Sequence, residues 1–266
     1  MPTVEIAASP LAPGVSPVRI HYRDIGHGRP LVVLHGGWGY EIYPFDRQAD
    51  ALARDHRIVI PDRTGYGRSG RLAAQAVDFH QRAADETLAV IDELGLDRPV
   101  LWGHSDGAVI SLLMGLTRPD LVAAIILEAT HLYRSKPASR AFFDTMMRDP
   151  DGLGEKVAGV LARDHGESWR DMIRINGVAW RRIADERSTP DEDLYGGRLS
   201  ELHVPALVIH GAKDPRTEPG ELDALRASLP RARFAIIAEG GHSPHSERLT
   251  ADEVTEVARG FLDGRD

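Results

Sequence analysis

Residues 100–112, VLWGHSDGAVISL, hold one serine between two glycines, where an apolar run gives way to a helix-like run. Gly103 and Gly107 stand two residues either side of Ser105. A strand that ends at a serine and turns at once into a helix strains the backbone of that serine. Its neighbours two residues away then crowd each other, so both are best as glycine. The stretch therefore predicts a strand, a sharp turn and a helix, with Ser105 presented on the turn as a nucleophile.

Short apolar runs alternate with helix-like stretches along most of the chain. The continuous runs are typical of strands buried on both faces of a parallel sheet; they lie at residues 30–36, 56–62, 99–105, 122–130, 206–214 and 233–240. Residues 16–26 alternate instead, which predicts an antiparallel strand near an edge. Helical spacing is found at residues 84–94, before Gly95, and at residues 251–262. The pattern predicts an α/β fold, with a mostly parallel central sheet and helices on both faces.

One long stretch interrupts this alternation. Residues 131–201 hold no strand-like run, but several helix-like pieces rich in Arg and Asp that carry large apolar side chains. We expect a helical lid or cap insertion at 131–201, and a core domain formed by residues 1–130 and 202–266. The alternative is a helical subdomain that packs against the core for stability alone.

The composition excludes several classes of site. The chain has 266 residues, no cysteine and a formal net charge of -8, so disulfides, thiolate metal sites and cysteine nucleophiles are ruled out. The acidic balance argues against a nucleic-acid or anionic-membrane surface. The N-terminus lacks the pattern of a signal peptide, and the apolar runs are far shorter than the ~20 residues that span a bilayer. We expect a soluble, cytoplasmic protein with a small-molecule substrate and neither a nucleic-acid nor a membrane partner; the oligomeric state stays open.

A serine nucleophile needs a base to remove its proton and an acid to orient that base. The chain order for this type of turn is serine, then acid, then histidine. Asp214 and His242 each stand just past a predicted strand, and would meet Ser105 at the carboxyl ends of the parallel strands. They are the predicted acid and base. Glu128, at another strand end, is an alternative acid, and His245 is an alternative base.

The attacked carbonyl becomes an oxyanion, which needs two fixed N–H donors. One is predicted to be the backbone N–H of Asp106, directly after the nucleophile. The other should come from residues 35–39, HGGWG, which directly follow a predicted strand. Gly37 is the predicted second donor of the oxyanion hole, and Trp38 is the alternative.

A second glycine-rich segment, residues 61–70, matches the dinucleotide-binding letters G-x-G-x-x-G. That fingerprint requires an acidic residue at the end of a second strand about 20 positions on, where this chain is helix-like. We interpret the segment as a loop that shapes the site. The histidines outside the predicted triad show no metal-ligand spacing, so no cofactor and no metal are predicted.

The motifs together resemble the α/β-hydrolase superfamily over nearly the whole chain; they are HGGWG at 35–39, DRTGYGRS at 62–69, GHSDG at 103–107, GAKDP at 211–215 and GGHSPH at 240–245. Within it, the chain looks most like the valacyclovir hydrolase (biphenyl hydrolase-like) group. In that group an aspartate beside the nucleophile binds the α-amino group of amino-acyl esters, and Asp106 is the matching position. The resemblance thus implies a substrate-binding role for Asp106.

The predicted activity is cofactor-free hydrolysis of small esters through an acyl-enzyme, with α-amino-acyl esters as the class that the resemblance implies. Trp38, Tyr40 and Trp102, together with the lid, are expected to shape an apolar pocket, with Trp38 in contact with substrate. One alternative is a carbon–carbon bond hydrolase of ring-cleavage products; those enzymes typically carry Ser-Met where this chain has Ser-Asp. A second is a catalytically slow ligand receptor of the same fold.

Overall fold

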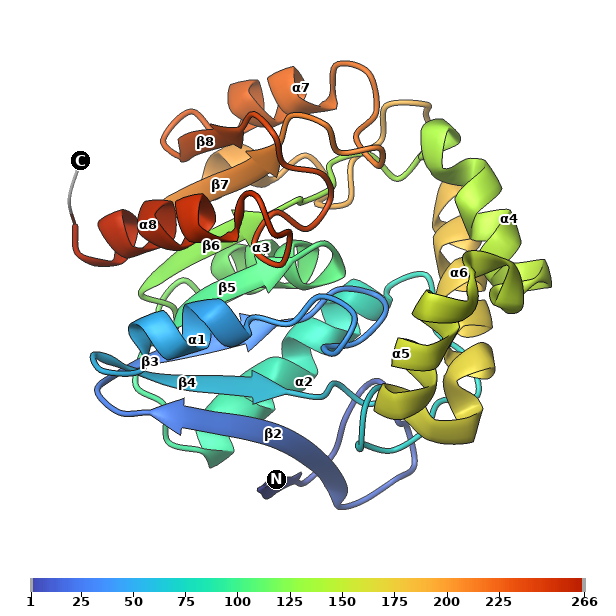
Figure 1. The fold of residues 1–266 in the computed structure, drawn as a ribbon, viewed down its shortest axis with the longest axis horizontal. Helices are drawn as coiled ribbons and strands as arrows, with labels where there is room; N and C mark the ends of the chain where they lie inside the picture. The colour runs from blue at the N-terminus through green and yellow to red at the C-terminus, as the bar shows by residue number, and fades with distance from the viewer. Residues whose placement is uncertain (1, 265–266) are drawn as a thin grey trace.

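An eight-stranded sheet crosses the protein, whose computed structural model describes residues 2–264 (Figure 1). Its strands lie in the order β1-β2-β4-β3-β5-β6-β7-β8. From β4 to β8 all neighbours are parallel, whereas β2 is antiparallel to both β1 and β4. The strands are β1 Thr3–Ile6, β2 Val18–Gly26, β3 Arg29–Leu34, β4 His56–Pro61, β5 Val100–His104, β6 Ala124–Glu128, β7 Ala206–Gly211 and β8 Arg233–Ile237.

The burial of most strands follows their sequence patterns. Strand β8 is the exception, because it forms an edge of the sheet and is only partly buried, although its apolar run predicts burial on both faces. Strands β5, β6 and β7 are buried along most of their length on both faces, as continuous apolar runs predict. In β2, Val18, Ile20 and Tyr22 are buried and alternate with more exposed residues, and the strand is antiparallel as predicted. The edge itself is formed by β1, a strand that the sequence analysis did not predict.

Helices cover both faces of the sheet. The helices α1 (Asp46–Leu52) and α8 (Ala251–Leu262) pack on one face, and α2 (Phe79–Glu93), α3 (Asp106–Thr117) and α7 (Glu221–Ser228) pack on the other. The predicted α/β architecture, with a mostly parallel sheet between two helical layers, is confirmed. Within residues 2–264 no helix combines the length and apolar character needed to cross a membrane.

Residues 131–201, here called the helical insertion, connect β6 to β7. Its helices between residues 140 and 185 lie beyond the carboxyl ends of the parallel strands, at the right of Figure 1, and the segment after them runs back toward the start of β7. The division of the chain into a core and a lid domain remains a prediction. The elements of the insertion are α4 Arg140–Arg148, α5 Glu155–His165, α6 Trp169–Asp185 and the single 3-10 turns η1 Pro137–Ser139, η2 Pro150–Leu153, η3 Gly166–Ser168 and η4 Leu199–Glu201.

Candidate active site

Ser105 stands on the sharp turn between β5 and α3, with φ 54° and ψ −119°. This region is strained for a residue with a side chain, and such strain concentrates at functional sites. A Cβ on Gly103 would collide with the carbonyl of Gly107, and a Cβ on Gly107 would collide with the carbonyl of Leu34. Both positions therefore require glycine. Gly103 does so because of the mutual crowding that the sequence predicts, whereas Gly107 does so because it lies against the end of β3.

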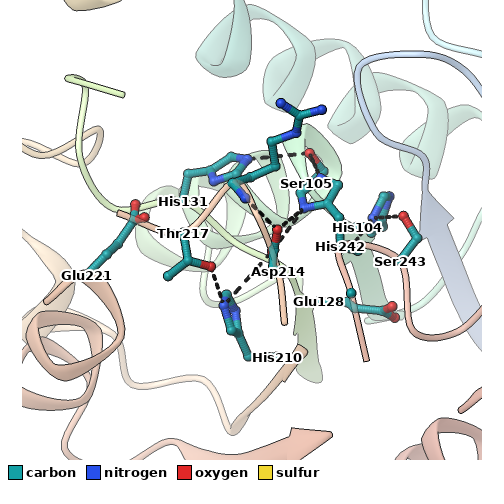
Figure 2. A network of polar contacts seen from close by, with 12 residues as sticks. His104, Ser105, Glu128, His131, His210, Asp214, Thr217, Glu221, His242 and Ser243 are labelled. Atoms are coloured by element: carbon teal, nitrogen blue, oxygen red, sulfur yellow. Dashed lines mark hydrogen bonds and ion pairs between the residues drawn. The ribbon is translucent and has the colours of Figure 1, made fainter. Parts of the chain in front are cut away.

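An unbroken line of hydrogen-bonding groups joins Ser105, His242 and Asp214 (Figure 2). The Nε2 atom of His242 lies 3.1 Å from the Oγ atom of Ser105. On the other side of the ring, Nδ1 lies 2.9 and 3.0 Å from the two carboxylate oxygens of Asp214. The three side chains predicted as nucleophile, base and acid are thus brought together from β5 and from the loops after β7 and β8.

The carboxyl group of Asp214 is held in its ionised form. Burial by itself would raise its pKa, but the hydrogen bond and charge of His242 outweigh burial and lower the pKa to about 2. The backbone N–H of Arg216 also donates to Asp214, at 2.8 Å. An ionised carboxylate at this position fixes the His242 ring with Nδ1 protonated and Nε2 free to accept a proton.

The two alternative residues, Glu128 and His245, form a separate buried pair. His245 Nδ1 lies 2.7 Å from Glu128 Oε1, which also accepts the backbone N–H of His245 at 3.0 Å. The other ring nitrogen faces the carbonyl of Tyr43 at 3.0 Å. Both side chains are fully buried. The structure therefore joins these two residues to each other and does not join either side chain to Ser105.

His131 contacts the nucleophile although the sequence analysis did not single it out. Its Nε2 lies 3.5 Å from Ser105 Oγ, at the outer limit of a hydrogen bond, and its ring stacks at 13° to that of His242. Burial lowers the pKa of His131 well below its ordinary value, so the ring is neutral. His131 comes just after the apolar run 122–130, so the strand-end rule that selected Asp214 and His242 would have found it too.

The backbone N–H groups predicted for the oxyanion hole belong to residues in the cavity beside Ser105. Asp106 is the first residue of α3, and Gly37 follows β3. Among residues 2–264, no group accepts a hydrogen bond from the N–H of Gly37 or of Asp106. A Cβ on Gly37 would come within 2.7 Å of the Asp106 carboxylate and 2.9 Å of Asn176. A side chain at this position would have to displace these two buried groups.

The Asp106 side chain is buried and accepts three hydrogen bonds. His80 Nε2 and the Trp180 indole N–H lie 3.2 and 3.0 Å from Oδ1, and the Asn176 amide lies 3.1 Å from Oδ2. Burial would raise the pKa of Asp106, but the hydrogen bond and charge of His80 lead a set of contacts that lower it. The carboxylate therefore links the start of α3 to α2 and α6. Its predicted role in substrate binding stays a prediction.

A cavity of about 260 Å³ opens in front of Ser105, a size suited to a small ligand. Trp38, which is predicted to contact substrate, lies in its wall and stacks on Tyr43 and Phe142. Within residues 2–264 no group of three or more His, Asp or Glu side chains has an arrangement that could hold a metal ion. The lining residues are Gly36, Gly37, Trp38, Tyr43, His104, Ser105, Asp106, His131, Lys136, Ser139, Phe142, Phe143, Asn176, Trp180, Pro215, Arg216, His242, Ser243 and Glu247.

The expectation that Tyr40 and Trp102 shape this cavity is wrong. Both side chains are buried in the core between the sheet and the helices α1 and α8. The Tyr40 hydroxyl donates to Asp46, and the Trp102 indole donates to Glu128. Trp102 lies within β5, where side chains point to the faces of the sheet, whereas the cavity lies beyond the carboxyl end of that strand.

Comparison with known proteins agrees with the fold. Residues 31–257 match the model of the alpha/beta hydrolase family. The chain belongs to the alpha/beta hydrolase family and is a hydrolytic enzyme. The predicted superfamily and fold class are confirmed.

Two relatives and one solved structure show the range of its similarity. The chain is 28% identical over 270 residues to 2-hydroxy-6-oxononadienedioate/2-hydroxy-6-oxononatrienedioate hydrolase of Paraburkholderia phymatum, covering 89% of this chain and 90% of the relative. It is 25% identical over 259 residues to the serine hydrolase BPHL of Homo sapiens, covering 93% and 84%. A thermophilic esterase from Thermogutta terrifontis shares the fold, with a TM-score of 0.74, 24% identity and 99% coverage of both chains.

Proposed function

We propose that this chain hydrolyses small-molecule esters through an acyl-enzyme formed on Ser105. The observation that carries the proposal is the line of contacts from Ser105 Oγ through the His242 ring to the ionised Asp214 carboxylate. This arrangement supplies a nucleophile, a base and an orienting acid in one place. The adjoining cavity is large enough for a small acyl or alcohol group.

In the first half of the reaction, Ser105 Oγ attacks the ester carbonyl carbon while His242 Nε2 takes the hydroxyl proton. The carbonyl oxygen becomes an oxyanion, which accepts hydrogen bonds from the N–H groups of Gly37 and Asp106. Asp214 stabilises the resulting imidazolium. The bond to the alcohol oxygen then breaks, His242 gives its proton to that oxygen, and the acyl group stays on Ser105.

In the second half, a water molecule takes the place of the departed alcohol. His242 removes a proton from this water as it attacks the acyl carbon, and the same N–H groups hold the second oxyanion. The bond to Ser105 Oγ breaks, and His242 returns the proton to the serine. The carboxylic acid leaves, and the enzyme is restored without any cofactor.

The finer substrate classes have unequal support. The α-amino-acyl esters depend on a free Asp106 carboxylate, but this carboxylate already accepts three hydrogen bonds. Carbon–carbon bond hydrolysis is supported by the printed function of the Paraburkholderia relative. This chain nevertheless has Asp106 after the nucleophile, where those hydrolases typically carry methionine. Ester hydrolysis requires only the groups already described, so it is the function that we propose.

The test combines covalent labelling with turnover. A fluorophosphonate probe should add once, on Ser105, and Ser105→Ala should abolish labelling and lower kcat on para-nitrophenyl acetate by on the order of 10⁴-fold or more. Ser200→Ala, at an exposed serine, is the matched control and should label and turn over as the wild type does.

Two outcomes would contradict the proposal. Labelling that persists in Ser105→Ala would place the nucleophile elsewhere. A wild-type protein that labels on Ser105 but turns over no ester would be the slow ligand receptor, with its site intact and its catalytic cycle absent.

A further inference from the structure

Four charged side chains line the cavity, and three of them are already satisfied within the described protein. The Lys136 ammonium lies 2.7 and 2.8 Å from the two oxygens of Glu221, in a fully buried pair. The Glu247 carboxylate accepts two backbone N–H groups from the loop after β8. Asp106 has the three donors described above. The fourth charged side chain is Arg216.

The Arg216 guanidinium has no carboxylate partner among residues 2–264. It is half-buried, and its central carbon lies 3.1 Å from the centre of the Phe142 ring. Burial lowers the pKa of Arg216, in spite of the opposing effects of Tyr43 and Asp214. The arginines at the protein surface show the contrast, since Arg170 packs on Trp169 and also pairs with Asp151 at 2.7 Å.

A half-buried arginine that stacks on an aromatic ring and lacks a carboxylate partner favours the binding of an anionic ligand. Its flat face rests on an aromatic ring, which leaves the N–H groups at the edge of the fork for hydrogen bonding. A half-buried cation that lacks a counter-charge also loses solvation without an ion pair in return. A carboxylate that enters the cavity would supply that ion pair and could accept two parallel N–H donors.

We infer that Arg216 binds a carboxylate group of the substrate, so that the preferred substrates are anionic esters. This inference rests on the proposed ester hydrolysis and names the substrate class of the same cavity. Arg216 follows Asp214 by two positions, so the specificity residue and the catalytic acid lie on one loop. Substrate recognition and the catalytic acid are thus held by the same short segment.

The charges of the cavity also disfavour the opposite substrate class. An ammonium group would have to enter a space of about 260 Å³ beside the unpaired Arg216 cation. The counter-charge for an ammonium would have to come from Asp106 or Glu247. The two oxygens of Asp106 already accept hydrogen bonds from His80, Trp180 and Asn176, and those of Glu247 accept two backbone N–H groups. Like charges at close range in a partly buried site repel strongly.

The experiment compares matched ester pairs in wild type and Arg216→Gln. One pair carries the charge on the acyl side, as para-nitrophenyl adipate monoester and its methyl-capped neutral form. The other carries it on the leaving group, as para-acetoxybenzoate and its methyl ester. For at least one pair, Arg216→Gln should lower kcat/KM on the anionic member about 30- to several-thousand-fold more than on the neutral member. Arg216→Lys, which keeps the charge without the fork, should recover part of this loss.

Arg170→Gln is the matched control, because it removes an aromatic-stacked arginine that lies outside the cavity. It should leave the ratio of anionic to neutral turnover unchanged. Fluorophosphonate labelling of Arg216→Gln checks that its active site is folded. Equal losses on both members of both pairs, or a wild-type preference for para-nitrophenyl glycinate, would overturn the carboxylate assignment while ester hydrolysis stood. No turnover of any ester by the wild type would instead remove the proposed function.

Discussion

Two buried carboxylates at the ends of neighbouring strands have different partners, and this difference separates their roles. Asp214 contacts the histidine that contacts Ser105, whereas Glu128 contacts His245. Both carboxylates are ionised, since their histidine contacts outweigh burial and lower both pKa values. The chemistry of the site therefore depends on which histidine each carboxylate orients, and only Asp214 orients the one in reach of the nucleophile.

Asp214→Asn should lower kcat by up to about 10⁴-fold, because a neutral amide neither fixes the tautomer of His242 nor stabilises its imidazolium form. Steady-state kinetics on a neutral para-nitrophenyl ester measure the loss. Asp223→Asn, at an exposed carboxylate on α7, is the control and should retain wild-type kcat. Wild-type kcat in Asp214→Asn would mean that another acid serves His242.

The contacts among Ser105, His242 and Asp214 were predictable because the positions of these residues follow from chain order and strand ends. The environment of Asp106 was not. Its three donors lie 26, 70 and 74 residues away, on α2 and α6, and meet it only through helix packing. Sequence spacing contains no signal for such contacts. Trp102 shows a related limit, since a continuous apolar strand does not reveal which side chain faces which layer.

At the scale of elements, the Glu128–His245 pair fastens the loop after β8 to the end of β6. That loop carries His242, three residues before His245. The His245 ring also stacks on Phe45 with 3.7 Å between ring centres. Strand β6 is an interior strand of the sheet, so the pair anchors the loop that carries His242 to one of the most buried parts of the molecule.

Glu128→Gln should destabilise the protein by about 1–3 kcal/mol, because the amide cannot accept with both oxygens the hydrogen bonds from His245 and from the Trp102 indole, and a buried donor is left unsatisfied. For a chain of this size that corresponds to a fall in Tm of roughly 2–12 °C. Thermal unfolding followed by circular dichroism measures it, with the exposed Glu256→Gln as the control. An unchanged Tm combined with a loss of kcat as large as that of Asp214→Asn would make Glu128 the catalytic acid.

Element boundaries were predicted well where a long periodic pattern ends in a recognisable signal. The last helix was predicted at residues 251–262 and is found there as α8. Gly95 follows α2 with a φ of 59°, the left-handed conformation expected after a helix. Strand β1 was missed because its four residues alternate too briefly to separate them from a loop. Its strand conformation comes from pairing with β2.

At the scale of the whole molecule, several histidines are folded into the interior without charge. Burial lowers the pKa of His35 and His131 well below the ordinary value, and lowers the pKa of His104 to about 3. The unfolded chain binds protons on these residues below about pH 6.5, whereas the folded protein does not. Their contribution to stability is therefore complete above about pH 6.5 and is lost as the pH falls toward the folded-state values.

The free energy of unfolding should begin to fall near pH 6.5. Each of these histidines contributes about 1.4 kcal/mol per pH unit below that point, so the three together give roughly 4 kcal/mol per unit. The carboxylates affect stability only at lower pH. The pKa of Asp214 in the folded protein is about 2, so its contribution to the free energy of unfolding is lost only below about pH 4. Urea titrations between about pH 8 and about pH 5 measure the curve. A flat curve down to about pH 5 would contradict burial of neutral rings.

The order of the sheet was predictable in outline, since alternating strands and helices leave few topologies. The placement of the helical insertion on the sheet was not. Helix α6 has a clear apolar face, on which Met172, Ile173 and Trp180 are buried. Such a face predicts that the helix packs against another part of the protein, but it does not identify that part. The partner surface is formed by residues far away in the chain, and only the folded structure brings them together.

The positions of the site residues along the chain also determine when activity can arise during synthesis. Ser105 leaves the ribosome early, but its base follows 137 residues later, at His242. The close fit of Gly107 against the Leu34 carbonyl further requires α3 to be docked on the completed middle of the sheet. A growing chain therefore carries an inert serine until His242 has been translated and folded into place. The chain therefore has no catalytic activity during its synthesis, and no inhibitor is needed to prevent it.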